Sequence, residues 1–248
     1  MRRFFVESVD INGASAFISG ADARHAETVL RLKPGDQIEL IDGTGAVYPA
    51  RIHSFFSKQV KVDLIGKATR MTESLLRITV AQAFLKDKKM DTLARQLSEL
   101  GITVWIPFIS ERSVSRPNPQ RLESRQQRWR KIAQESLKQC RRGQALQIEP
   151  TVSFEEVLSA GQSSDLKIIF WESEERTLHT LVEAGQSNKV PQSVFLIIGP
   201  EGGFTKQEVQ RATGCGFQSV SLGPRILKAE TAAVAAGALI QYIFGDLG

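Results

Sequence analysis

Two glycine-bearing segments, GPEGGF at residues 199–204 and GPRILKAETA at 223–232, have the residue types of a ligand-binding loop. Each follows a short run, VFLII at 194–198 or QSVSL at 218–222, that predicts a strand. Three glycines within five residues exceed what one tight turn needs, and glycine lets a backbone approach a ligand closely. Taken alone, GPEGG is equally compatible with a plain strand-to-helix connection. Two such loops after two strands favour one shared site.

The elements that would position these loops alternate between strand and helix from Leu75 onward, which predicts an α/β domain with a mostly parallel sheet covered on both faces. Ligands of such sheets bind outside the carboxyl ends of the strands, where WESEE at 171–175 also lies. Thr205 with Glu208 predicts a capped helix start. The predicted strands are 77–85, 103–109, 167–171, 194–198 and 218–222, and the predicted helices are 91–101, 120–140, 177–185, 205–213 and 230–244.

The first 65 or so residues have a different pattern, with short strands and turn signals. Asp42-Gly43 predicts a hairpin, and Asp22 is a plausible N-cap for a helix that runs to Arg31. This region is predicted to be a small β-barrel, joined to the α/β domain through the polar linker 66–74. The predicted domains are therefore 1–70 and 75–248, with barrel strands at 37–41, 46–55 and 59–65.

Several ligand classes are excluded by the motifs. The chain has no GxxxxGK[ST], and no GxGxxG opens a helix after a strand, since DGTGAV at 42–47 lies between two predicted strands. Three scattered histidines support neither a Ser-His-Asp triad nor a histidine metal site. A pocket lined by flexible backbone and by the aliphatic Leu222, Ile226 and Leu227 suits a flat heterocycle better than a polyphosphate.

Composition and net charge indicate the cellular compartment of the protein. The 248-residue chain has a net charge of +5 and only two cysteines, which favours a reducing compartment. The start MRRFFVESVD lacks an apolar export segment, and the apolar stretch 232–244 is too short to span a bilayer. We therefore expect a cytoplasmic protein with no membrane or metal partner.

Positive charge is concentrated in residues 112–142, which hold ten Lys or Arg against two acids. Apolar residues from Leu122 through Trp129 to Leu137 recur at helical spacing, so the segment predicts an amphipathic helix with a basic outer face. A merely solvated face would carry mixed signs. Contact with nucleic-acid phosphates is the better interpretation.

These motifs resemble a known family. IIGPEGGFT, SLGPRILKAETA, VLRLKPGDQIELIDGTG and LSELGITVWIPFISERSV are similar to the bacterial 16S rRNA uracil-N3 methyltransferases of the SPOUT superfamily, over nearly the whole chain. The resemblance implies a PUA-like N-terminal barrel, a SPOUT domain with a trefoil knot, a homodimer, and S-adenosylmethionine as cofactor. It places these residues at the cofactor: Phe170, Trp171, Glu172, Ile198, Gly199, Glu201, Gly203, Leu222, Gly223, Ile226 and Leu227.

The resemblance also suggests residues for catalysis. A uracil imide nitrogen needs a base or an anion-stabilising cation. Arg225 is the candidate that stabilises the uracil oxygens or grips the target phosphate. Glu230 is a candidate base or positioning acid, or simply a carboxylate at a helix N-terminus. Glu201 either binds the ligand or shapes its own loop.

The implied substrate is small-subunit 16S rRNA, methylated at N3 of a uridine. Two alternatives remain open: a SPOUT enzyme acting at another RNA position, and an inactive RNA-binding protein. The second is suggested only by Lys228-Ala229, where the family usually has Arg-Thr. The candidate RNA-binding residues are Arg2, Arg3, Arg24, Arg31, Arg112, Arg116, Arg121, Arg125, Arg128, Arg141 and Arg142.

Overall fold

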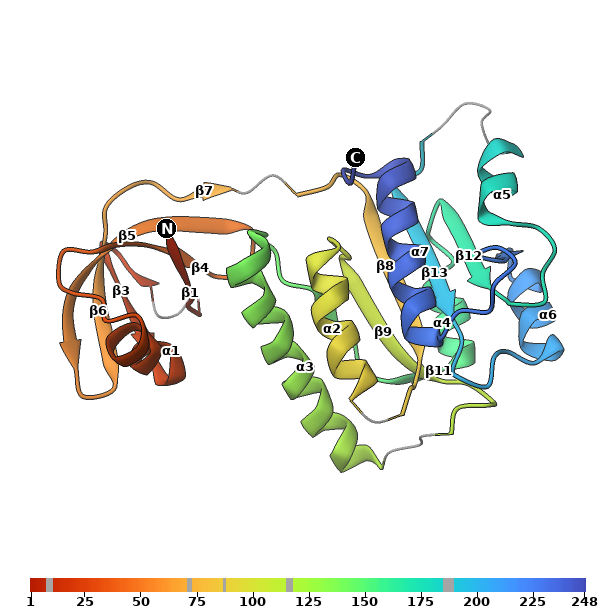
Figure 1. Ribbon diagram of the computed structural model, residues 1–248, viewed down its shortest axis with the longest axis horizontal. Helices are drawn as coiled ribbons and strands as arrows, with labels where there is room; N and C mark the ends of the chain where they lie inside the picture. The colour runs from red at the N-terminus through yellow and green to blue at the C-terminus, as the bar shows by residue number, and fades with distance from the viewer. Residues whose placement is uncertain (8–10, 71–72, 87, 115–117, 185–189) are drawn as a thin grey trace. The chain divides into compact units, whose positions relative to one another are not determined.

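The computed structural model describes residues 1–7, 11–70, 73–86, 88–114, 118–184 and 190–248 (Figure 1). The chain forms two compact units. The first contains Met1–Glu73 together with Gln134–Ala145, and the second contains Ser74–Ala133 and Leu146–Gly248. The sequence places 134–145 in the α/β domain, whereas in the structure this segment belongs to the first unit.

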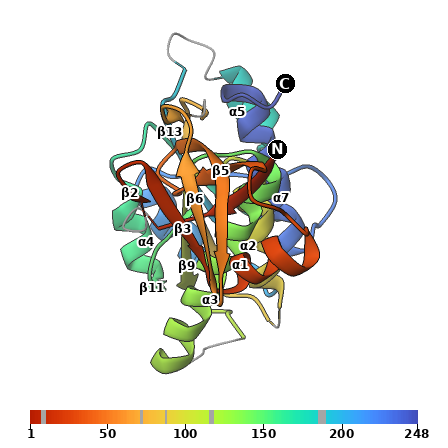
Figure 2. The same ribbon diagram turned by 90° about the vertical axis from the view of Figure 1, so that its left-hand side faces the viewer.

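The first unit is built on a strongly curved mixed sheet (Figure 2). Its order is β1-β4-β5-β6-β3-β2, with β7 paired to β5; β1 and β4 run parallel and the remaining pairs antiparallel. The alternation of buried side chains along β4 and β6 places Ile38, Leu40, Val60 and Val62 in the core. The bounds are β1 Arg2–Phe5, β2 Ile11–Asn12, β3 Ser15–Ser19, β4 Gln37–Ile41, β5 Ala46–Phe56, β6 Gln59–Leu64 and β7 Thr69–Arg70.

The predicted helix start at Asp22 is wrong. Helix α1 spans Gly20–Arg24 with Ser19 as its N-cap, and a single π-helical turn, His25–Val29, continues it. Gly20 has φ +65°, which lets the chain turn straight out of β3. The Asp22 carboxylate instead receives hydrogen bonds from Nζ of Lys138, at 2.7 and 2.8 Å.

The second unit contains a fully parallel sheet, as the alternating pattern predicts. The strand order is β10-β9-β8-β13-β12-β14, with β11 also paired to β9. Strands β8, β13 and β12 are buried on both faces, which explains their continuous apolar runs. The bounds are β8 Arg77–Ala83, β9 Val104–Ile109, β10 Gln147–Ile148, β11 Val152–Ser153, β12 Leu166–Phe170, β13 Ser193–Ile198 and β14 Gln218–Val220.

Helices cover both faces of this sheet, so the predicted layer arrangement is confirmed. Helices α2, α5 and α7 and the first part of α3 pack on one face, and α4 and α6 pack on the other (Figure 1). The capping box predicted at Thr205 and Glu208 is present at the start of α6. A second one at Ser153 and Glu156 starts α4, a helix that the sequence analysis missed. The bounds are α2 Lys89–Glu99, α3 Pro119–Cys140, α4 Phe154–Ala160, α5 Leu178–Ala184, α6 Lys206–Gly214 and α7 Ala229–Phe244.

Candidate functional site

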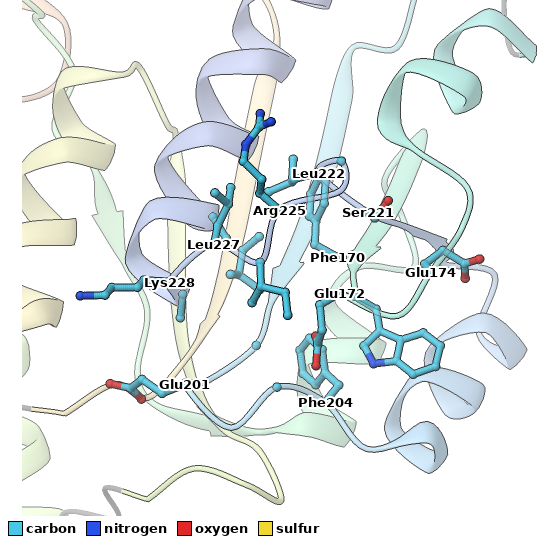
Figure 3. A pocket seen from close by; sticks show the side chains of 18 of the residues that line it. Phe170, Glu172, Glu174, Glu201, Phe204, Ser221, Leu222, Arg225, Leu227 and Lys228 are labelled. Carbon is cyan, nitrogen blue, oxygen red and sulfur yellow. The ribbon is translucent and has the colours of Figure 1, made fainter.

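A cavity of about 850 Å³ lies in the second unit at the carboxyl ends of β12, β13 and β14 (Figure 3). The loops that follow these strands form its walls, and the first residues of α2 and α7 complete it. Because the strands are neighbours in one parallel sheet, their following loops meet at one edge. The cavity is bordered by each residue that the resemblance places at the cofactor: Phe170, Trp171, Glu172, Ile198, Gly199, Glu201, Gly203, Leu222, Gly223, Ile226 and Leu227.

The loops after β12 and β14 are joined by main-chain hydrogen bonds. The Trp171 N–H donates to the Val220 carbonyl at 2.9 Å, and the Ser221 N–H donates to the Arg176 carbonyl at 2.8 Å. The Leu178 N–H donates back to the Ser221 carbonyl at 3.1 Å. These bonds extend the ladder past the strand ends and fix the two loops relative to each other.

The glycines of the 199–204 loop are explained largely by the protein's own packing. Only Gly203 has a positive φ, +66°, and a Cβ there would overlap the Glu172 carboxylate. A Cβ on Gly199 would lie 3.1 Å from the Phe204 ring, and one on Gly202 would lie 3.2 Å from Cβ of Arg112. The buried Gln82 amide also donates to the Gly199 carbonyl at 3.0 Å. The loop is therefore held in one shape from several sides.

Glu201 points away from Glu172 and Phe204, toward the segment that joins β8 to α2 (Figure 3). Its Oε1 accepts hydrogen bonds from the Lys86 N–H at 3.1 Å and from Nζ of Lys89 at 2.9 Å. Burial by itself raises the pKa of Glu201, but these donors and its own N–H outweigh burial and lower the pKa below its usual value. The contacts favour the loop-shaping role among the two that the sequence left open.

The ion pair between Glu201 and Lys89 makes the free energy of unfolding depend on pH. A carboxylate whose pKa is lower in the folded than in the unfolded chain stabilises the fold above its unfolded pKa. That contribution is lost as the pH falls through the folded pKa. We expect Glu201→Gln to flatten the decline of the thermal unfolding midpoint between about pH 5 and pH 3. Glu123→Gln, at an exposed carboxylate of α3, is the matched control and should leave the wild-type decline unchanged; equal pH profiles for wild type and Glu201→Gln would contradict the prediction.

The second loop, from Leu222 to Lys228, carries the candidate catalytic arginine. Gly223 has φ +104°, and the loop presents an exposed Arg225 with no hydrogen bond or ion pair within the described chain. Figure 3 shows the Arg225 guanidinium directed away from Glu172 and Phe204. The Ile226 side chain is 84% exposed, which is unusual for an aliphatic residue beside a cavity.

Glu230 is placed differently from Arg225. It lies in the first turn of α7 and is not among the described residues that border the cavity. Its Oε2 is buried without a hydrogen-bond partner among the described residues and lies 3.4 Å from Nζ of Lys89. This environment favours a positioning acid over a base that reaches the substrate.

The basic helix α3 has the predicted amphipathic form in its first part, where Trp129 and Ala133 are buried and Arg121 and Arg130 are exposed. Several arginines of the segment have intramolecular partners, and Arg130 itself donates to the Ile148 carbonyl at 3.4 Å. The Arg128 guanidinium pairs with Asp91 at 2.7 Å, Arg125 lies over the Phe84 ring at 5.4 Å, and Arg112 donates to the Gly202 carbonyl at 3.2 Å. Arg116 lies outside the described residues.

The candidate arginines of the first unit also divide into two groups. Arg3 pairs with Glu39, its cross-strand neighbour, at 2.7 Å, and Arg142 pairs with Glu73 at 3.0 Å; both guanidinium groups are largely buried. The exposed members are Arg2, Arg24, Arg31 and Arg141.

Sequence reasoning gave no role to several residues of the cavity wall, among them Lys89, Phe204 and Ser221. Lys89 and Phe204 contribute side chains, and Ser221 lies within the joined loops. Phe204 was visible as the end of the GPEGGF motif, and it stacks on Phe108 with ring centroids 6.5 Å apart. No local signal marks Lys89, because its role depends on the order of the strands.

No helix in the described part of the chain is long and apolar enough to cross a membrane. Among the same residues, no cluster of His, Cys, Asp and Glu could hold a metal ion.

Comparison with known proteins relates this architecture to two domain families. The RNA methyltransferase domain family matches residues 72–241, and the RNA methyltransferase PUA domain family matches residues 18–64. The chain is 29% identical over 247 residues to ribosomal RNA small subunit methyltransferase E of Bacillus subtilis, covering 98% of this chain and 96% of that protein. It is 30% identical over 245 residues to the same-named protein of a Buchnera aphidicola strain, covering 99% and 94%.

Two solved structures are similar to this chain over almost its whole length. A ribosomal RNA small subunit methyltransferase E from Neisseria gonorrhoeae, bound to S-adenosylmethionine, superposes with a TM-score of 0.87 at 31% identity over the whole of both chains. A methyltransferase from Legionella pneumophila, also bound to this cofactor, superposes with a TM-score of 0.88 at 30% identity, covering 99% of this chain and 98% of that one.

Proposed function

Because the chain belongs to the RNA methyltransferase family, among relatives named ribosomal RNA small subunit methyltransferase E, we propose that it transfers a methyl group from S-adenosylmethionine to N3 of a uridine in 16S rRNA. The observation that carries the proposal is the cavity at the strand ends, bordered by every residue that the motif assigns to the cofactor. The first unit, matched in part by the PUA domain family, is proposed to bind the RNA.

The cavity fits this cofactor. The glycine loops bring their backbone to its wall, and the exposed Ile226 offers an apolar surface for a flat base to cover. Gly199, Gly203, Leu222 and Leu227 are proposed to hold the adenosine part. When bound, S-adenosylmethionine supplies a methyl group already activated by its sulfonium.

The remaining task of the protein is to orient and activate the uracil. Correct alignment of nucleophile and donor supplies about 7–11 kcal/mol toward the barrier. An imide N–H becomes more acidic when a cation lies beside its carbonyl oxygens, so the N3 proton can pass to water. The nitrogen lone pair then takes the methyl group, and the electrons of the broken C–S bond stay on sulfur as a neutral thioether. Arg225, an exposed cation at the cavity with no ion pair among the described residues, is proposed to stabilise the negative charge that develops on the uracil oxygens. Glu230 is proposed to act from α7 as a positioning acid.

A primer-extension assay on small-subunit rRNA tests the proposal. N3-methylation blocks base pairing, so reverse transcriptase should stop at one uridine in RNA treated with the protein and the cofactor. A stop at a base other than uridine, or methylation of such a base, would favour the alternative of an enzyme that acts at a different RNA position. Cofactor binding by calorimetry without methylation of any RNA would favour an inactive RNA-binding protein.

Further expectations belong to this proposal. The protein is proposed to act as a homodimer with a trefoil knot in its second unit, as the resemblance implies. The small ribosomal subunit or its RNA is the proposed partner, and the cytoplasm is the proposed location.

RNA contact by the exposed face of α3 has a measurable signature. Arg121 is exposed, and its side chain has no partner within the described chain. We expect Arg121→Ala to weaken RNA binding uniformly across sequences and to reduce the slope of log K against log salt by about 0.7–0.9. The matched control is Arg95→Ala, on α2, where the arginine pairs with Glu99 at 3.9 Å and has no other ion pair among the described residues. An unchanged salt slope for Arg121→Ala would remove this residue from the RNA interface.

A further inference from the structure

Lys89 stands where three segments of the second unit meet. It is the first residue of α2, in the connection that follows β8, and it borders the cavity. Its Nζ lies 2.9 Å from Oε1 of Glu201, on the loop after β13, and 3.4 Å from Oε2 of Glu230, at the start of α7. One ammonium group therefore contacts one carboxylate on the loop after β13 and one on α7, the helix that follows the 222–228 loop.

We propose that Lys89 is a positioning residue that ties the 199–204 loop to the 222–228 loop and its helix, and so sets the shape of the cofactor cavity. The proposal rests on the proposed function, because it concerns the same cavity. Lys89 acts through Glu201 and Glu230, not by contact with the reacting atoms.

The charges explain why the ammonium is needed. Glu201 and Glu230 side chains are only 25% and 24% exposed, and Glu230 Oε2 has no hydrogen-bond partner among the described residues. A partly buried carboxylate without a partner is costly. Without Lys89, the carboxylates of Glu201 and Glu230 would lie in one region with no cation between them. Movement of one loop would relieve their repulsion.

The two carboxylates differ in how strongly they depend on Lys89. Glu201 keeps a second donor, the Lys86 N–H at 3.1 Å, so its loop retains one tether when Lys89 is removed. Glu230 has no such second donor among the described residues. Because Glu230 lies in the first turn of α7, its displacement would shift the start of this helix, which closely follows Leu227 in the chain.

Lys89 remains charged throughout the working range. The hydrogen bond from its ammonium to Glu201 is the main cause that raises the pKa of Lys89 above its usual value. This direction excludes Lys89 as a base that accepts a proton near neutral pH, and it agrees with a permanent electrostatic tether.

The fold of the second unit does not depend on this ammonium. Helix α2 is anchored in the core by Met90, Leu93 and Leu97, whose side chains are fully or almost fully buried. Lys89→Met is therefore expected to leave a folded protein, with a thermal unfolding midpoint only modestly below that of the wild type because the core contacts of α2 are kept.

The test measures S-adenosylmethionine affinity by calorimetry and methyl transfer at saturating RNA, on the full chain. We expect Lys89→Met to weaken cofactor binding about tenfold or more, as loss of a charged hydrogen bond would. Lys89→Arg keeps the charge and should restore most of the affinity. The matched control is Lys88→Met, at the neighbouring exposed lysine with no side-chain partner in the described chain, which should bind like wild type.

A double-mutant cycle separates positioning from a general structural effect. If Lys89 acts through Glu230, the double variant Glu230→Gln with Lys89→Met should lose less cofactor affinity than the sum of the losses in the two single variants. Additive losses, no rescue by Lys89→Arg, or wild-type cofactor affinity in Lys89→Met would each overturn the inference. A wild-type chain that neither binds the cofactor nor methylates RNA would instead overturn the proposed function, and this inference with it.

Discussion

Replacing Arg225 with alanine is expected to lower the rate of methyl transfer by about 100- to 1000-fold, the loss typical of removing one donor that stabilises a developing anion. S-adenosylmethionine affinity should stay near wild type, because the guanidinium has no hydrogen bond or ion pair within the described chain that would hold the cavity loops in shape. The rate is measured in single turnover at saturating cofactor, and the affinity by calorimetry.

Two further variants define the origin of that loss. Arg225→Lys keeps the positive charge but lacks the planar fork, so partial activity would indicate charge stabilisation and almost none would indicate bidentate recognition. Arg95→Ala, an exposed arginine of α2 that does not border the cavity, is the matched control and should retain wild-type turnover. Wild-type turnover in Arg225→Ala would remove Arg225 from the catalytic residues.

Replacing Trp129 with alanine is expected to lower the free energy of unfolding of the second unit by about 3–5 kcal/mol. Trp129 is 1% exposed and packs between Trp105 and Phe84, with ring centroids 5.0 and 5.8 Å away. Its Nε1–H also donates to Asp91 at 3.0 Å. The variant therefore loses apolar burial, aromatic contact and a hydrogen bond together, and the basic face of α3 loses its anchor.

The measurement is chemical denaturation followed by the circular dichroism of the helices. Trp129→Phe keeps most of the ring volume and isolates the contribution of the hydrogen bond to Asp91, about 0.5–3 kcal/mol. Gln127→Ala changes an exposed position on the same helix and should be nearly neutral. A loss below about 1 kcal/mol in Trp129→Ala would show that α3 is not held by this contact.

Local patterns predicted most elements of the second unit. The capping box at Thr205 and Glu208 forms because both partners lie within one helical turn, and it needs nothing from elsewhere in the chain. Gly101, with φ +79°, follows the end of α2 for a similarly local reason. Ser153 and Glu156 are a local signal of the same type, and they mark the start of α4, which is not among the helices expected from the sequence.

Predictions failed or changed where a distant partner decides the outcome. Asp22 does not cap its helix, because its carboxylate pairs with Lys138, which is remote in sequence. Arg3 and Arg142 pair with Glu39 and Glu73, and their contact with RNA stays a prediction. A charge count along the sequence cannot distinguish such committed arginines from exposed ones such as Arg121.

The sequence by itself determined the two glycine loops, the strands that precede them and, through the family motif, the residues that border the cavity. The loops and strands are set by neighbours within a few positions, so backbone propensity and spacing predict them. The assignment of single residues to the cavity came from the family resemblance. The tertiary structure alone decided that β8 lies beside β13. That adjacency brings Lys89 to Glu201 and Glu230, because strand order depends on how separated segments pack, which no local pattern encodes.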